Sequence, residues 1–214
     1  EGWWGPTFLV PGDPQARMLI IEKNLPGAII VNKLGQRFVN ESSSYTKVTR
    51  GLFAANKPGA ESIPAYMIFD ATYRQRYPIG PMLPSTFQPD FAVPGAIKQA
   101  IPSAMDIREL ARKLGVDADG LAATVSRFNG FARSGKDEDF GRGAAAYDNE
   151  WHQAFTPMRT DTSWPANTMP SITMHPLRDE GPYYATILAA GALDTNGGPV
   201  IDARSRVLDT RDKP

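Results

Sequence analysis

The stretch PYYATILAAGALDTNGGPVID, residues 182–202, decides the fold because it predicts a strand, a loop and a second strand near the end of the chain. Tyr183 and Tyr184 open the first strand, and successive strand side chains point to opposite faces of a sheet. We therefore expect one tyrosine ring in the core and the other pointing outward. The backbone of such a strand needs partners, so the element must lie against other strands.

The first half of the chain predicts further strands. Residues 27–40 predict a hairpin, in which GAIIVN and RFVN are strands and Gly35 lies in the turn. Residues 65–71, AYMIFDA, predict another strand. Five prolines between residues 77 and 95 exclude regular structure from most of that segment, and we expect it to be a mobile surface excursion.

Two helices follow, each with a start and a stop signal. Asp106 is an N-cap residue and Gly115 a C-terminal signal for the first helix; Asp117 and Gly135 play the same parts for the second. The two form a helical hairpin that covers one side of the sheet. Residues 136–180 predict loops. Strands, then helices, then strands favour an α+β fold with a mixed or antiparallel sheet.

Composition excludes several classes of function. Lys and Arg together number 23, as do Asp and Glu, so no net charge favours nucleic acid or an anionic membrane. There is no cysteine, which excludes disulfides and thiolate chemistry. No apolar run approaches the ~20 residues that a membrane-spanning helix requires. We expect a cytoplasmic protein with no nucleic-acid partner and no membrane span.

Three short motifs carry little chemistry. GRGAAA, residues 141–146, matches a dinucleotide-binding fingerprint in letters, but it follows the acidic loop KDEDF instead of a buried strand. His152 and His175 are too few and too far apart to indicate a metal site, so we predict none. A Ser-His-Asp site remains possible by residue count, although no nucleophile-elbow pattern is present.

Four longer stretches carry a resemblance: LPGAIIVNKLGQRFVNESSSY (residues 25–45), FDATYRQRYPIG (69–80), FNGFARSGKDEDFGRGAAAYD (128–148) and the opening stretch. Together they resemble the flavoprotein superfamily of fumarate reductase and the 3-ketosteroid dehydrogenases, and most closely the 3-ketosteroid Δ1-dehydrogenases. In that superfamily both chain ends build a Rossmann-like FAD domain, and a substrate-binding (catalytic) domain is inserted between them.

The resemblance implies a division of this chain. Residues 1–24 would be a flank from the FAD domain, residues 25–180 the substrate-binding domain, and residues 181–214 a truncated return segment. EGWWGPTFLV then looks like a cut through a longer protein. We expect most of what the late strands face to be missing, and FAD to be bound by the full-length protein but not by this piece.

The resemblance also implies site residues. Tyr45 in NESSSY takes the place of the family's tyrosine in proton abstraction, Tyr184 that of the tyrosine that polarises the 3-keto oxygen, and Gly191 would complete the oxyanion site through its N–H. Asn196, Gly197 and Gly198 would lie against the flavin ring. A tyrosine with a pKa near 10 is a poor base without a partner. Possible aromatic walls for a flat apolar substrate are Trp3, Trp4 and Phe8.

Two departures argue against the fumarate reductase reading. The arginine that donates a proton in those enzymes is replaced here by Asn24, followed by Leu25 and Pro26. Their dicarboxylate-binding histidine is replaced by Asp194, which would repel a dianion. We predict a hydrophobic ketone or steroid-like substrate, and the FAD domain as partner. The alternatives are a flavin-dependent reductase of an unsaturated acid and a non-catalytic binding domain.

Overall fold

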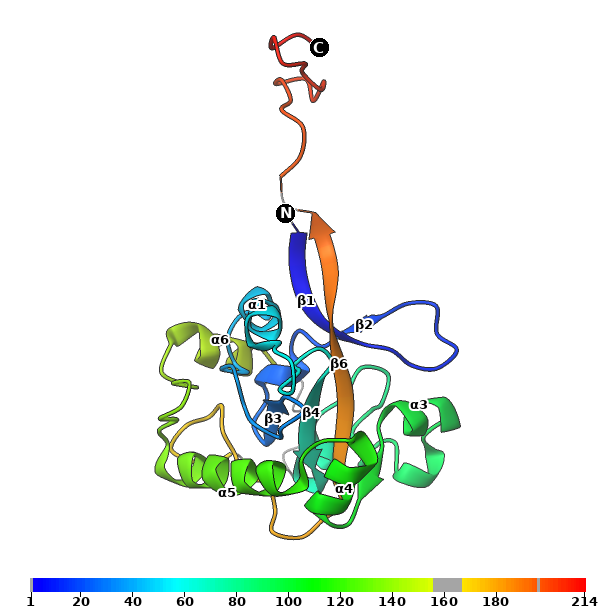
Figure 1. Cartoon of the computed structure of the whole chain (residues 1–214), viewed down its shortest axis with the longest axis vertical. Helices are drawn as coiled ribbons and strands as arrows, with labels where there is room; N and C mark the ends of the chain where they lie inside the picture. Colours follow the sequence, from blue (N-terminus) through cyan, green and yellow to red (C-terminus); the bar gives the residue numbers. More distant parts are fainter. Residues whose placement is uncertain (1, 156–166, 196) are drawn as a thin grey trace.

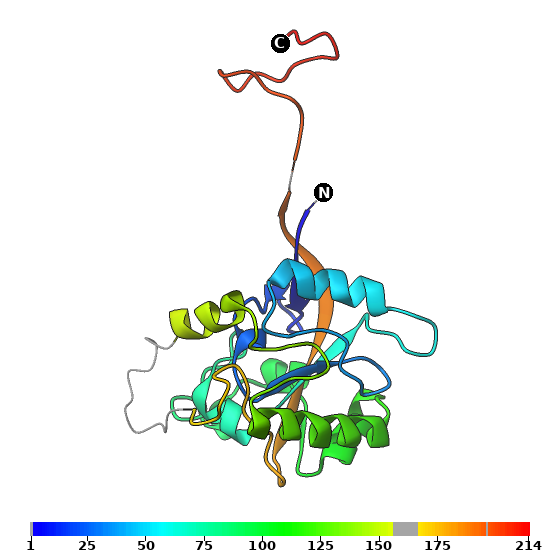
Figure 2. The same ribbon diagram turned by 90° about the vertical axis from the view of Figure 1, so that its left-hand side faces the viewer.

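One continuous strand, β6 (Tyr183–Thr195), runs through the middle of the sheet in the computed structural model, which describes residues 2–155, 167–195 and 197–214 (Figure 1). Its first half pairs with β4 (Ala65–Asp70), and its second half pairs with β1 (Gly2–Phe8). The strand expected after the loop is reduced to a single bridge between Ile201 and Val207. That last segment extends away from the body of the molecule (Figure 2).

The sheet has the order β2-β1-β6-β4-β3, and β5 also pairs with β6. The remaining strands are short: β2 (Arg17–Met18), β3 (Ala28–Val31) and β5 (Ser103–Ala104). All five strand pairings are antiparallel, which confirms the expected kind of sheet. The hairpin predicted over residues 27–40 keeps its turn, but its second strand makes only one bridge, between Val31 and Arg37.

The helical hairpin is confirmed to the residue. The Asp106 carboxylate caps α4 (Ile107–Leu114), the Asp117 carboxylate caps α5 (Ala118–Ser134), and Gly115 and Gly135 adopt the left-handed conformation after them. Sequence reasoning missed several helices, of which the two longest are α1 (Tyr45–Ala55) and α6 (Ala146–Phe155), the second within the predicted loop. Trp164, in the same predicted loop, lies outside the described residues. The shorter helices are η1 (Glu22–Asn24), α2 (Ala71–Arg76), η2 (Asp90–Ala92) and α3 (Gly95–Ala100).

Both faces of the sheet are covered, so the expectation that one of Tyr183 and Tyr184 points outward is wrong. Tyr184 packs with Phe69 and Leu188 in a core that also holds Ile30 and Leu52. Tyr183 packs in the second core, on the side that α4 and α5 cover (Figure 1). A strand with helices or loops on both faces buries both sets of side chains.

The proline-rich segment is not a simple surface excursion. It lacks long regular elements, as predicted, but Ile79, Met82 and Val93 are buried in the core. The buried guanidinium of Arg74 donates to the carbonyl oxygens of Leu83 and Gln88, the latter at 2.6 Å. One buried cation thus satisfies loop carbonyls that no strand pairs with.

A buried cluster of charges ties the segment before α1 to the loop after α5. The two Glu41 carboxylate oxygens each accept a hydrogen bond of 2.8 Å from Arg37, which also donates to Asp137. Arg142 approaches Glu41 at 3.3 Å from the other side. Burial alone would raise the pKa of Glu41, but Arg37 and then Arg142 outweigh it and keep that pKa below its ordinary value.

Arg142 gives the GRGAAA motif a structural explanation. This fully buried side chain donates to the carbonyl oxygens of Ala28 at 2.7 Å and Leu25 at 3.0 Å, and to Ser42 Oγ at 3.1 Å. The motif therefore places an arginine in the core beside β3, and its letters match a dinucleotide fingerprint without the strand–turn–helix geometry that phosphate binding needs.

The buried charges predict a large effect of one carboxylate. Glu41→Gln leaves Arg37 and Arg142 short of negative charge in the interior, and we expect it to lower the free energy of unfolding by about 3–5 kcal/mol. Asp119→Asn is the matched control, because it removes one carboxylate from the exposed pair with Arg108, where we expect a loss below about 1 kcal/mol. Urea unfolding followed by tryptophan fluorescence measures both. Equal losses would contradict the assignment of Glu41 as the buried centre of charge.

Two glycines of α5 predict opposite effects of the same substitution. A Cβ on Gly120 would lie 2.1 Å from the Leu34 carbonyl oxygen, whereas a Cβ on Gly130 would meet nothing within 4 Å. Gly130→Ala should therefore stabilise the protein by about 1 kcal/mol through helix propensity. Gly120→Ala should destabilise the protein by about 1–3 kcal/mol, because the turn that carries Leu34 must move. Thermal unfolding of both variants checks the signs, and stabilisation by Gly120→Ala would exclude the close contact.

Candidate functional site

Tyr45 is the first residue of α1, and the helix start fixes its position. Ser44 is the N-cap, with its hydroxyl accepting from the Lys47 N–H, and Thr49 Oγ1 donates to the Tyr45 carbonyl oxygen at 2.9 Å. The tyrosine is half-buried. Ser44 and the apolar residues Val48 and Leu52, four apart, are a helix signal that the sequence contained and that sequence reasoning did not use.

The Tyr45 ring lies beside a pair of glycines. Its Cδ2 atom is 3.8 Å from the place that a Cβ on Gly5 would occupy, and Gly5 is directly opposite Gly191 in the pairing of β1 with β6. Met18 crowds the same place, at 2.9 Å from its sulfur. The fold thus brings Tyr45 and Gly191, two of the predicted site residues, to the same part of the β1–β6 ribbon.

The surroundings of this part of the ribbon are apolar and partly open. Trp3 is 43% exposed and Trp4 37% exposed, and the Trp4 ring meets the ring of Phe53 edge-on with centroids 6.3 Å apart. Leu193 is also exposed. Phe8, the third predicted wall residue, is buried in the core and is not available to a substrate. The two exposed tryptophans of β1 can present flat apolar surface to a ring system.

Tyr184 occupies a different place. Its ring stacks on Phe69, 5.5 Å between centroids, and its hydroxyl donates to Asp90 Oδ2 at 2.7 Å. Burial, and then the hydrogen bond to Asp90, raise the pKa of Tyr184 well above its usual range. The cavity that it lines has a volume of about 120 Å³, whereas ligand pockets usually measure about 300 Å³ or more. A ketone would have to compete with the Asp90 carboxylate for this hydroxyl.

Tyr184 and Gly191 do not meet. They are seven residues apart on the single strand β6, which at about 3.3 Å per residue places them roughly 23 Å from each other. An odd spacing also places them on opposite faces of the strand. The prediction that they share one oxyanion site is therefore wrong, because the resemblance supplied Gly191 as the next glycine in the sequence and the extended strand carries it away from Tyr184.

The glycines expected against the flavin follow the end of β6. Gly197 has φ +93°, a conformation that favours glycine, and no atom lies within 4 Å of where its Cβ or that of Gly198 would be. Both residues are exposed. Asn196, the third residue of this prediction, lies outside the described residues. The backbone here is open to the approach of a planar group.

The two positions at which the sequence departs from fumarate reductases, Asn24 and Asp194, lie in different surroundings. Asn24 is buried, donates to the Ile20 carbonyl oxygen at 2.9 Å and accepts from Lys23. Asp194 is exposed, opposite Trp3 on the ribbon. An amide that is buried and hydrogen-bonded in this way cannot replace a proton-donating arginine.

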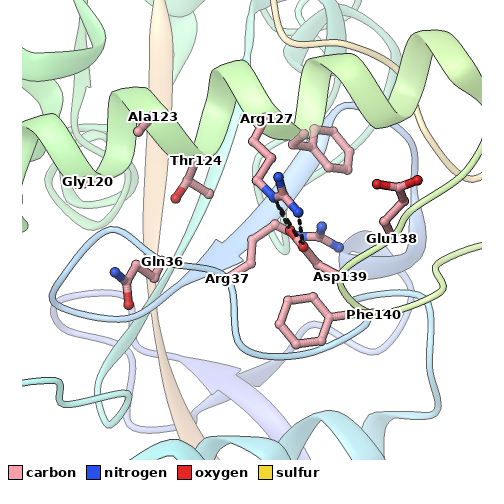
Figure 3. A pocket seen from close by; sticks show the side chains of 10 residues that line it. Gln36, Arg37, Gly120, Ala123, Thr124, Arg127, Glu138, Asp139 and Phe140 are labelled. Atoms are coloured by element: carbon pink, nitrogen blue, oxygen red, sulfur yellow. Dashed lines mark hydrogen bonds and ion pairs between the residues drawn. The ribbon is translucent and has the colours of Figure 1, made fainter.

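A larger cavity lies elsewhere. About 560 Å³ opens between α5 and the turn that carries Gln36, and Figure 3 shows Arg127 reaching across it to Asp139, at 2.7 Å. Arg37 forms part of its wall, with its guanidinium 5.2 Å from the Phe140 ring centroid. Arg37 pairs with Glu41 and Asp137, which do not line the cavity. None of the predicted site residues lines it.

Within the described part of the chain, no three His, Cys, Asp or Glu side chains gather as metal ligands, and no helix combines the length and apolar character needed to cross a bilayer. His175 Nδ1 lies 2.8 Å from the Pro176 carbonyl oxygen. The side chain of His152 is outside the described residues.

Known relatives agree with this architecture. The chain is 37% identical over 220 residues to 4-oxocyclohexanecarboxylate 2-dehydrogenase of Sinomonas cyclohexanicum, covering 100% of this chain and 35% of that protein. It is 38% identical over 212 residues to 3-oxosteroid 1-dehydrogenase of Mycolicibacterium smegmatis, covering 97% of this chain and 34% of that protein. The chain thus spans about a third of the length of these curated relatives.

The fold has a close counterpart in the crystal structure of 3-ketosteroid Δ1-dehydrogenase from Sterolibacterium denitrificans in complex with 1,4-androstadiene-3,17-dione. The TM-score is 0.83 at 34% identity, over 100% of this chain and 36% of that one. The sequence pattern of the FAD binding domain family matches residues 1–214. The chain therefore belongs to the FAD binding domain family of flavoproteins, as its resemblance predicted.

Proposed function

We propose that the chain supplies the substrate-binding (catalytic) domain, residues 25–180, with flanks 1–24 and 181–214, of an FAD-dependent dehydrogenase acting on a 3-ketosteroid-like substrate. The observation that carries the proposal is the placement of Tyr45, half-exposed beside the Gly5–Gly191 pair, in a chain of the FAD binding domain family. Two relatives are named for substrates in which a ring carries a ketone, which supports the substrate class.

The reaction removes a proton and a hydride from neighbouring carbons. In the proposed reaction the oxygen of Tyr45 takes the proton from the carbon next to the ketone, and a carbon–carbon double bond remains after the hydride leaves the next carbon. The chemistry that FAD supplies when bound is acceptance of that hydride. The exposed tryptophans of β1, Trp3 and Trp4, offer flat apolar surface for the ring system.

Gly197 and Gly198 fit a place against the flavin ring. Without a Cβ, and with nothing within 4 Å of where one would be, their backbone can approach a planar ligand closely. The phosphates of FAD need the N–H groups of a helix start that follows a glycine-rich turn. Among the described elements, no such turn joins a strand to a helix. We propose that these groups come from the remainder of the full-length protein.

The apolar ribbon separates this function from the alternatives. An unsaturated dicarboxylate would need cations, and Asn24 is buried while Asp194 is acidic. A non-catalytic binding domain would need no tyrosine at a partly open apolar surface.

Comparing a 3-keto-4-ene steroid with 4-oxocyclohexanecarboxylate as substrates separates the two ketone classes. We expect the steroid to be preferred because Trp3, Trp4 and Leu193 offer apolar contact.

The proposal predicts a selective loss in Tyr45→Phe of the full-length protein. The ring remains, so the dissociation constant of the ketone should stay within about threefold, whereas flavin reduction should slow by about 10²–10⁴ because the proton acceptor is gone. Anaerobic stopped-flow bleaching of the flavin measures both. Tyr183→Phe is the matched control: its hydroxyl donates to the Arg178 carbonyl oxygen in the second core, and we expect near wild-type reduction. A Tyr45→Phe protein with the wild-type rate would remove Tyr45 from the reaction.

A second prediction concerns the cofactor. The 214 residues alone should be colourless and bind no stoichiometric FAD, whereas the full-length protein should be yellow, because the phosphate-binding groups lie outside the described elements. Absorbance spectra and calorimetric titration with FAD make the comparison. Tight binding by the 214 residues alone would show that the chain carries its own phosphate site.

A further inference from the structure

Lys23 is a buried cation that donates hydrogen bonds to residues 41–43, just before Tyr45, and to its neighbour Asn24 on η1. The side chain is fully enclosed, on η1. Its Nζ donates to the Ser43 carbonyl oxygen at 2.5 Å, to the Glu41 carbonyl oxygen at 3.1 Å and to Asn24 Oδ1 at 2.8 Å. An ammonium has three N–H donors, so each of them has an acceptor.

Two of the three acceptors belong to the turn that leads into α1. The carbonyl groups of Glu41 and Ser43 flank Ser42, whose hydroxyl donates back to the Asn24 carbonyl oxygen at 3.4 Å. Ser44 then caps the helix, and Tyr45 is its first residue. Lys23 and Asn24 thus fasten η1 to residues 41–44, one residue before the proposed proton acceptor.

Charges of both signs surround the ammonium. Arg142 repels it, while Asp148, Glu41 and Glu22 attract it. Burial, and then the repulsion by Arg142, lower the pKa of Lys23 to about 7. A lysine in such a place is costly, so a purely space-filling role would be served better by an apolar side chain.

We propose that Lys23 is a positioning residue: its three hydrogen bonds fix the turn 41–44 and thereby hold Tyr45 beside the Gly5–Gly191 pair. The inference rests on the proposed function of Tyr45. Small displacements of a reacting group cost much of its rate, so loosening this turn should affect the chemical step more than substrate binding.

Lys23→Met in the full-length protein tests the proposal. We expect flavin reduction by a 3-keto-4-ene steroid to slow by about 10- to 100-fold, with the steroid dissociation constant within about threefold of wild type. Lys33→Met is the control, because Lys33 is exposed and its ion pair with Glu61 is long at 3.8 Å. The rate of flavin reduction should not change in this variant. A Lys23→Met protein that keeps the wild-type rate, or that loses steroid binding in proportion to rate, would overturn the proposal.

A second measurement needs no substrate. If the hydrogen bonds from Lys23 Nζ hold the carbonyl groups of Glu41 and Ser43, their loss should open the turn more often. In hydrogen exchange we expect the protection factors of residues 42–48 to be about 10-fold lower in Lys23→Met than in the wild type, while those of α5 and those of Lys33→Met stay unchanged. Equal protection of residues 42–48 in Lys23→Met and the wild type would show that Lys23 does not hold the turn.

The two measurements separate this inference from the function on which it rests. If Tyr45→Phe reduces its flavin at the wild-type rate, the proposed function fails, and hydrogen exchange alone decides whether Lys23 fastens the turn. If Tyr45→Phe is slow and Lys23→Met is not, the function stands and the positioning role is wrong.

Discussion

The placement of Glu41 between two buried arginines is the constraint on which the rest of the structure depends. Its carboxylate joins Arg37, in the turn after β3, to Arg142, in the loop after α5, and Arg142 carries the connection on to the carbonyl groups of Leu25 and Ala28. Buried charges are tolerated only when each is paired and hydrogen-bonded. The geometry of the segment that leads into α1 is therefore strongly restricted, and Tyr45 follows it by four residues.

β6 supplies the second constraint, because it joins two parts of the molecule that are remote in sequence. Its first half pairs with β4, and its second half pairs with β1. Gly191 lies opposite Gly5 because β6 continues beyond β4 to pair with β1. Phe8 and Leu19 pack into the same core as Ile30, which makes the opening segment continuous with the body in packing. Trp3 and Leu193 are exposed near the end of the β1–β6 ribbon. The chain spans about a third of the length of the curated relatives it matches.

What could be predicted from the sequence was local. The Asp106–Gly115 and Asp117–Gly135 signals fix helix ends through contacts within a few residues, so they were interpreted correctly. The length of β6 and the burial of both Tyr183 and Tyr184 depend on partners far away in the chain, and the predicted Tyr184–Gly191 site failed for that reason. Lys23 and Arg142 gave no signal, since a buried cation reads in sequence as an exposed one.

The family resemblance predicted a role for Tyr45, and the structure adds the setting of this residue: a half-buried tyrosine, a glycine pair and exposed tryptophans. The most direct test is a crystal structure of the full-length protein with FAD and a 3-keto-4-ene steroid. The account predicts the Tyr45 hydroxyl oxygen within roughly 3.5 Å of the ring carbon next to the ketone, a reactive distance. A steroid ring bound beside Tyr184 and Asp90, with Tyr45 remote from the ketone, would contradict it.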